Sequence, residues 1–167
     1  MSNDRGNTTR DEIEVETTPS VCRVVLLYRE ENFEAALDAF RSALGVNDFD
    51  GPLALPEMGL KIAVSWSSKL ELITPHGQGS YAEQMRHRLA DKGEGLASLV
   101  FRVPELDSGI ASAAAAGYPM LGTHIDCLEA NPAWKSRFAF ATEAPITPVG
   151  GIDIALMQFD PLHSIRF

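Results

Sequence analysis

The chain has 167 residues, a formal net charge of −9 and 45% hydrophobic residues. This length suits one domain, or two small halves that share a core, with a sizeable buried interior. The acidic balance argues against a nucleic-acid binder, which needs a basic surface for phosphates, and against docking on an anionic membrane. No apolar run approaches the roughly 20 residues of a membrane helix. These features predict a soluble globular protein.

Residues 1–20 are polar, rich in charge and threonine, and without periodicity, so we expect a flexible N-terminal tail. Residues 162–167 are expected to form a C-terminal tail. The N-terminus lacks the apolar segment of a secretory signal. Cys22 and Cys127 are too few for a disulfide framework or a zinc site, and reduced thiols are the simpler interpretation. A cytoplasmic protein is the resulting expectation.

From residue 21 the pattern changes to regular secondary structure. Aliphatic and β-branched residues in "VCRVVLLY" predict a strand. In "NFEAALDAFRSALG" the apolar residues fall at helical spacing, with Asn32 as the expected N-cap and Gly45 as the C-terminal stop. The first half should therefore contain a strand at 21–28, a helix at 32–45, and strands at 59–66 and 69–75.

A linker helix over about 79–92, with Tyr81, Met85 and Leu89 near one face, leads into a second half that repeats this order. Its expected elements are a strand at 97–103, a helix at 104–117 that Gly117 ends, and strands at 136–142 and 151–159. An irregular insertion at 123–136 is expected to form a loop over one face. The repeat predicts a two-fold pseudo-symmetric α+β domain, with modules at about 21–76 and 95–161.

Four segments together resemble the vicinal oxygen chelate superfamily, which includes glyoxalase I, methylmalonyl-CoA epimerase, extradiol dioxygenases and bleomycin-resistance proteins. They are "NFEAALDAFRSALG", "LELITP", "KGEGLASLVFRVPELDSGIASAAAAGY" and "GGIDIALMQF". The third is similar to the epimerase segment that follows an inter-repeat helix, and the resemblance covers about residues 21–161. It implies a glyoxalase-like fold of paired βαβββ modules, whose curved sheets enclose a cavity, and it makes a homodimer plausible.

The metal site of this superfamily takes one residue from each of four strands, usually two histidines and two acids or amides. The resemblance places these positions at Arg23 or Val25, at Glu71, at Ser98 and at Ala155. Only Glu71 matches, and a lone carboxylate is a poor divalent site, so we expect no metal and no other cofactor. Strand alternation turns the nearby Cys22 to the opposite face. The four histidines lie outside the strands predicted to line the cavity, and we expect them at the surface: His76, His87, His124 and His163.

Alternation also predicts which side chains face the cavity. The candidate substrate-binding residues are Arg23, Lys69, Ser98, Arg102, Asp153 and Phe140. Glu71 is the candidate catalytic residue, because burial would raise the pKa of its carboxyl and suit it to act as a base or to anchor a ligand. Equally, Glu71 can simply pair with Arg23 or Lys69. The aromatic residues Trp66, Trp134, Phe138 and Phe140 are candidates for ligand stacking, although core packing is the more ordinary role.

Three functions are consistent with these residues. The first is metal-independent binding of a small, mostly apolar organic molecule, as in bleomycin-resistance-like proteins. The second is an epimerase, isomerase or lyase that acts on a carbonyl or acyl-thioester substrate with Glu71 as general base. The third is a dimerisation module whose cavity is filled by its own side chains. No nucleic acid or membrane partner is expected.

Overall fold

The computed structural model describes residues 18–162, so most of the two predicted tails, 1–20 and 162–167, lies outside the described residues. The elements in chain order are β1 (Ser20–Leu27), α1 (Glu30–Leu44), β2 (Asp50–Leu55), β3 (Leu60–Ser65), β4 (Leu70–Pro75), α2 (Ser80–Lys92), β5 (Gly95–Arg102), α3 (Leu106–Ala115), β6 (Ile125–Asp126), α4 (Cys127–Ala130), the 3₁₀ helix η1 (Pro132–Ser136), β7 (Phe138–Val149) and β8 (Ile152–Pro161).

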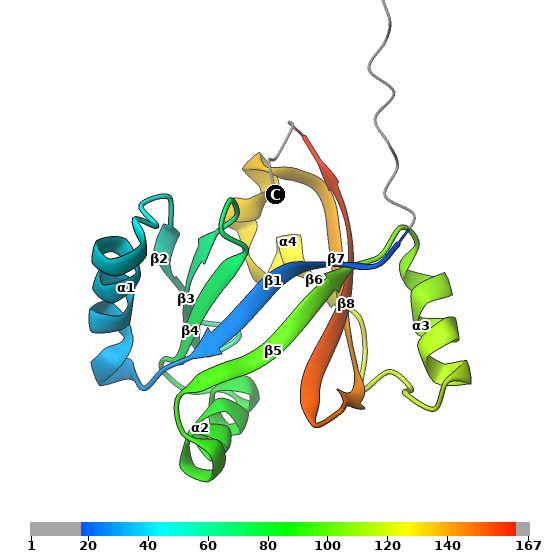
Figure 1. Ribbon diagram of the computed structural model, residues 1–167, viewed down its shortest axis with the longest axis horizontal. Helices are drawn as coiled ribbons and strands as arrows, with labels where there is room; N and C mark the ends of the chain where they lie inside the picture. Colours follow the sequence, from blue (N-terminus) through cyan, green and yellow to red (C-terminus); the bar gives the residue numbers. More distant parts are fainter. Residues whose placement is uncertain (1–17, 163–167) are drawn as a thin grey trace, which may run out of the picture.

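The strands of the described chain form one curled sheet in the order β2-β3-β4-β1-β5-β8-β7-β6 (Figure 1). The first module is β1-α1-β2-β3-β4 and the second is β5-α3-β6-β7-β8. Their first strands, β1 and β5, pair antiparallel at the centre, and each also pairs in parallel with the last strand of its own module. The second half of the order is therefore the first half reversed. The predicted α+β fold of paired βαβββ modules is confirmed.

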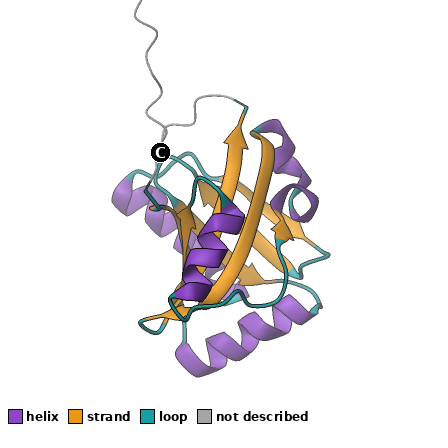
Figure 2. Cartoon of the chain, turned by 90° about the vertical axis from the view of Figure 1, so that its right-hand side faces the viewer, coloured by secondary structure: helices purple, strands orange, loops and turns teal. Residues whose placement is uncertain are grey.

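Helices α1 and α3 lie outside the curled sheet on opposite flanks, as Figures 1 and 2 show. The apolar face of α1 buries Phe33 and Leu37 completely against Leu72 and its neighbours. On the other flank, Leu106 of α3 packs with Leu156 and the residues around it. Because both helices cover the convex side, the concave side of the sheet remains for a separate core and a cavity.

Aromatic side chains fill one end of the concave side. Phe138 is 1% exposed, and its ring centroid lies 5.1 Å from that of Trp66 and 5.3 Å from that of Phe159. Trp134 completes the cluster, 5.0 Å from Trp66. Asp50, at the edge of this aromatic cluster, accepts hydrogen bonds from Trp66 Nε1 at 3.1 Å and from Arg137. All three, Trp66, Trp134 and Phe138, pack in the core, which is the ordinary role considered for them, and Trp134 also lines the cavity described below.

Three local expectations differ from the structure. Helix α1 begins at Glu30 rather than after Asn32, whose Nδ2 instead donates to Glu94 at 2.9 Å and ties α1 to the start of β5. Strand β2 had no clear signal, because "DGPLAL" lacks alternation and contains Gly-Pro. The insertion at 123–136 is not an irregular loop, since it contains β6, α4 and η1. No helix within residues 18–162 is long and apolar enough to cross a membrane.

Candidate functional site

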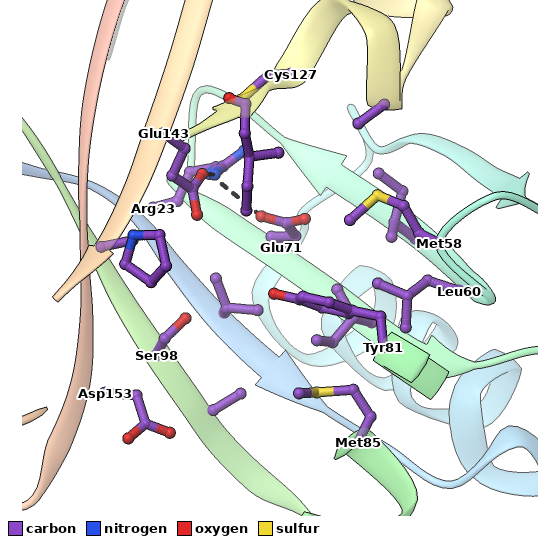
Figure 3. Close-up of a pocket in the computed structure, with 18 of the residues that line it drawn as sticks. Arg23, Met58, Leu60, Glu71, Tyr81, Met85, Ser98, Cys127, Glu143 and Asp153 are labelled. Carbon is purple, nitrogen blue, oxygen red and sulfur yellow. Dashed lines mark hydrogen bonds and ion pairs between the residues drawn. The ribbon is translucent and has the colours of Figure 1, made fainter. Parts of the chain in front are cut away.

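The other end of the concave side encloses a cavity of about 710 Å³, which is within the size range of organic-ligand sites. Strands of the sheet, helix α2 and the segment 121–134 all contribute side chains to its lining (Figure 3). Residues of α2 at helical spacing face it, among them Tyr81, Met85 and Arg88. Large aliphatic and thioether side chains form much of the wall: Val25, Leu55, Met58, Leu60, Ile62, Ile73, Met85, Leu121, Ile125, Ile146 and Ile154. The cavity therefore suits a largely apolar molecule.

A buried arginine lies at the polar end of this cavity. Arg23 is 3% exposed, its Nε lies 3.2 Å from Glu71 Oε2, and its Nη2 donates to Glu143. Its guanidinium carbon also lies 5.1 Å from the ring centroid of Trp134 and 6.0 Å from that of Trp66. Two carboxylates and two indole rings thus hold one cation in place, in the geometry of an ion-pair and cation–π cluster.

The protonation of this cluster follows from its burial. Burial lowers the pKa of Arg23, but the charges of Glu71 and Glu143 outweigh it, so the pKa of Arg23 is raised and the guanidinium stays charged. Burial raises the pKa of Glu71, attraction to Arg23 lowers it, and repulsion from Glu143 raises it again, with a net rise above the usual range. Glu71 is therefore a carboxyl that gains a proton more easily than an exposed glutamate.

Two further polar side chains extend into the same space. The ring of Tyr81 lies across the cavity with its hydroxyl directed towards Glu71 and Ser98 (Figure 3). Burial of this hydroxyl, together with the negative charges of Glu143 and Glu71, raises the pKa of Tyr81 to about 12, so Tyr81 is a neutral donor at physiological pH. Burial likewise raises the pKa of the Cys127 thiol, which lines the cavity near Arg23 and is therefore a poor nucleophile.

Strand register explains how four residues meet at one level of the sheet. Glu71 is opposite Val25, Val25 is opposite Ser98, and Ser98 is opposite Asp153, across β4, β1, β5 and β8. Residues opposite each other share a face of the sheet, and all four line the cavity. At the mouth, Asp153 pairs with Arg88. Val25, Glu71 and Ser98 in this row are positions at which the superfamily resemblance places metal ligands. The fourth such position, Ala155, lies two residues beyond Asp153 on β8 and also lines the cavity.

The side chains at those positions do not fit a divalent metal ion. Arg23, Val25, Glu71, Ser98 and Ala155 all line the cavity, but only Glu71 carries a carboxylate, and it contacts the guanidinium of Arg23. Within residues 18–162, no three His, Cys, Asp or Glu side chains are grouped as metal ligands would be. A fixed positive charge close to Glu71 and Glu143 also competes with any bound cation.

The structure brings together some of the predicted site residues and separates others. Arg23, Glu71, Ser98 and Asp153 line the cavity. The other three predicted residues, Lys69, Arg102 and Phe140, are not among its lining residues. Lys69 lies in the turn before β4 with a φ of 55°, outside the alternation of the strand. Arg102 lies at the far end of β5, with its guanidinium carbon 4.7 Å from the ring centroid of Phe159.

β-Bulges account for Phe140 and for Cys22. Phe138 and Phe140 oppose Pro161 and Asp160, which leaves Ala139 as an extra residue; Phe140 then turns outward and is 39% exposed. A similar irregularity leaves Cys22 unpaired on β1, so it packs in the same core cluster as Val25, against the expectation of an opposite face. Within the described chain His76, His87 and His124 do not line the cavity, whereas His163 lies outside the described residues.

Sequence reasoning missed several cavity residues. Glu143 lies on β7 just beyond the strand predicted at 136–142, and the bulge at Ala139 puts it in phase with the inward face. Asn131 lies in the insertion that was expected to be a loop. The sequence did contain a signal for Tyr81, because its spacing from Met85 marks one face of the linker helix. That face was not predicted to line the cavity.

Comparisons with known proteins address the fold. No protein-family model and no curated protein matches the sequence. A hypothetical protein from Bacillus halodurans C-125 superposes with a TM-score of 0.66 at 18% identity, over 84% of this chain and 94% of that one. Methylmalonyl-CoA epimerase from Mycobacterium tuberculosis gives a TM-score of 0.60 at 18% identity, over 83% and 86%. A mutant of 4-hydroxymandelate synthase from Streptomyces coelicolor gives 0.60 at 14% identity, over 87% of this chain and 50% of that one.

These similarities define the class of structure to which the protein belongs. The curled sheet of two βαβββ modules is shared with the epimerase and with the synthase, so the resemblance seen in the sequence is confirmed at the level of the fold. The chain has the glyoxalase-like fold of the vicinal oxygen chelate proteins. Sequence identities of 14–18% show that the fold is shared, but they do not show that the activity is shared.

Proposed function

We propose that the protein binds a small, mostly apolar organic molecule in the cavity, and that no metal ion takes part. The ion-paired Arg23 carries this proposal: it lies where the resemblance places a metal ligand and already supplies a positive charge to Glu71 and Glu143. The aliphatic wall supports it further, because it offers more apolar than polar contact to a ligand.

A substitution that fills the cavity tests this proposal. Ser98→Phe puts a large ring into the centre of the space, next to the apolar wall, and is expected to abolish ligand binding without unfolding the chain. The ¹³C-methyl NMR signals of Met58 and Met85, which both line the cavity, report binding during a screen of neutral aromatic and aliphatic compounds. Ser112→Phe, the same change on the exposed surface of α3, is the control.

We expect at least one compound to shift both methionine signals in the wild type and in Ser112→Phe, but not in Ser98→Phe. Equal shifts in all three proteins would contradict a binding site in the cavity. Homodimerisation and a cytoplasmic location stay predictions of the sequence.

One observation favours a second function, a carbonyl or acyl-thioester epimerase, isomerase or lyase. Glu71 is a cavity carboxyl with a raised pKa, as a general base requires, and a solved structure of similar fold is an epimerase that acts on a coenzyme A thioester, as its name says. Against it, Arg23 engages the same carboxylate and lowers its basicity.

Glu71→Gln separates the two functions. If the protein only binds its ligand, this nearly isosteric variant should retain the ligand within about tenfold in affinity, the equivalent of one hydrogen bond. If Glu71 removes a proton from a substrate, turnover should fall by about 10²-fold or more. Exchange of a carbon-bound proton of the ligand for solvent deuterium, followed by NMR, measures this directly. Exchange at the wild-type rate in Glu71→Gln would exclude Glu71 as the base.

A further inference from the structure

Two glutamates present open carboxylate oxygens to the polar end of the cavity. Glu71 is 8% exposed, and its contact with Nε of Arg23 at 3.2 Å is an ion pair without a hydrogen bond. Glu143 accepts one hydrogen bond, from Arg23 to Oε2, and its side chain is 18% exposed. Within residues 18–162, the fully enclosed side-chain atoms without a hydrogen-bond partner belong to Arg23, Thr74 and Asn131, and to neither glutamate. The unpaired oxygens of Glu71 and Glu143 are therefore acceptors that a molecule in the cavity can contact.

One guanidinium holds these two carboxylates side by side. Glu71 contacts Nε of Arg23, and Glu143 accepts from Nη2, a nitrogen bonded to the same guanidinium carbon. In Figure 3 both carboxylates lie beside Arg23, and the hydroxyl of Tyr81 is directed towards Glu71. This hydroxyl makes no hydrogen bond to the described part of the chain. A small polar group next to the pair can therefore contact two carboxylates and one hydroxyl oxygen.

The charges that line the cavity favour a cation. They come from two arginines and three carboxylates, which leaves one unit of negative charge when every carboxyl is ionised: Arg23, Arg88, Glu71, Glu143 and Asp153. Because Arg88 pairs with Asp153 at the mouth, the excess lies at the other end, where Arg23 alone faces two glutamates. The guanidinium disfavours a doubly charged metal ion at this place, but a singly charged group completes the neutralisation.

We propose that the polar end of this cavity binds the ammonium group of a singly charged amine with an apolar body, and that Glu71 and Glu143 hold this group. The inference rests on the proposed function, because it names the ligand class of the same cavity. An ammonium has three N–H donors and no acceptor, which matches two carboxylates and the hydroxyl oxygen of Tyr81. Hydrogen bonds between charged groups are about twice as strong as neutral ones. The aliphatic wall contacts the rest of the molecule.

Three naphthalene probes test this ammonium subsite on the full chain. 2-(Aminomethyl)naphthalene carries the ammonium, 2-ethylnaphthalene replaces its nitrogen by a methyl carbon, and 2-naphthoate carries a negative charge instead. Titration of the Met58 and Met85 methyl signals near pH 8 gives each affinity. We expect the ammonium to bind about tenfold more tightly than the ethyl compound, as a hydrogen bond to a charged group allows, and 2-naphthoate to bind more weakly than both.

Glu71→Gln keeps the shape of the side chain and removes its charge. The preference for the ammonium over the ethyl compound should fall to about twofold or less, with most of the change in the affinity of the ammonium. Asp126→Asn is the matched control, since it also removes one negative charge and keeps an oxygen that can cap α4, whereas Asp126 does not line the cavity. This control should keep the full preference.

The preference should also depend on pH through Glu71. Burial raises the pKa of this carboxyl above its ordinary value, and a bound cation favours the ionised form. The preference should therefore be present at pH 8 and decrease as the pH falls towards 5, whereas Glu71→Gln should show no such decrease. The other charged or titratable groups of the lining are Arg23, Tyr81, Arg88, Cys127, Glu143 and Asp153. Of these, Arg23, Tyr81 and Cys127 have raised pKa values and keep their charge over this range.

Equal affinities for the ammonium and the ethyl compound in the wild type would overturn the ammonium subsite and leave the proposed function standing, since both probes would still bind in the cavity. A preference that is unchanged in Glu71→Gln, or 2-naphthoate binding as tight as that of the ammonium, would also overturn it. If none of the three probes shifts the Met58 and Met85 signals, the proposed function fails and the subsite fails with it.

Discussion

Arg23→Met should lower the free energy of unfolding by about 3–5 kcal/mol near pH 8, the usual cost of removing one partner from a buried ion pair. Methionine retains much of the apolar volume of the arginine stem but leaves Glu71 and Glu143 without their cation. Glu71 is only 8% exposed, so water cannot replace the guanidinium. Urea denaturation of wild type and variant at several pH values measures the loss.

The loss should depend on pH in a defined direction. Glu71 already has a folded-state pKa above its unfolded value, and without Arg23 the rise becomes larger. A raised pKa means that stability is fully present below the unfolded value, about 4.3, and is lost as the pH rises through the folded value. The difference between wild type and Arg23→Met should therefore be largest near pH 8 and should shrink towards pH 4.

A combined variant isolates the ionic origin of this effect. Adding Glu71→Gln and Glu143→Gln to Arg23→Met removes the unpaired charges and should restore at least about half of the lost free energy. A loss that is independent of pH, or that the two glutamines do not relieve, would contradict the description of Arg23 as a buried counter-ion and would point to packing alone.

Phe138→Ala should lower the free energy of unfolding by about 3–5 kcal/mol, because it removes a fully buried ring and leaves a hole that its neighbours cannot close. Phe138 is 1% exposed and contacts the rings of Trp66, Trp134 and Phe159 edge to face. Since this cluster fills the concave side beyond Arg23, the variant should also enlarge the cavity. Chemical denaturation gives the stability, and the largest screened compound that still shifts the Met58 and Met85 signals gives the size of the cavity.

Phe140→Ala is the matched control for this experiment. The two phenylalanines are two residues apart on β7, and the bulge at Ala139 puts Phe140 on the outer face, where it is 39% exposed. Its truncation should cost less than about 1 kcal/mol. Similar losses for both variants would contradict the strand register from which Glu143 derives its inward position.

The fold was accessible from the sequence because its signals are local and repeated. The apolar spacing in 32–45 and the Gly45 stop mark α1, whose end at Leu44 the structure confirms with Gly45 at a φ of 69°. The resemblance carried by "LELITP" placed Glu71 at a cavity position, and Glu71 lines the cavity. Each of these features depends on residues within one element, which is the scale on which spacing and capping act.

The composition of the site was less accessible, because β-bulges change the phase of alternation by one residue. The extra residue Ala139 puts Phe140 on the outer face of β7 and Glu143 on the inner face. Cys22 and Ala97 are likewise left unpaired between β1 and β5. A one-residue shift exchanges the two faces of a strand, and the local sequence gives no signal that predicts such a bulge. Asn131 was missed for another reason, since its role depends on a short helical turn within the insertion.

The proposed function requires that Arg23, and not a metal ion, supplies the positive charge of this cavity. The most direct test is the affinity of a compound that shifts both the Met58 and Met85 signals, measured first with EDTA and then with Mg²⁺, Mn²⁺, Co²⁺ or Zn²⁺ in excess. Arg23 as the resident cation predicts dissociation constants that agree within about twofold under all conditions. Binding that needs a metal, together with paramagnetic broadening of Met58 and Met85 by Mn²⁺ or Co²⁺, would contradict it.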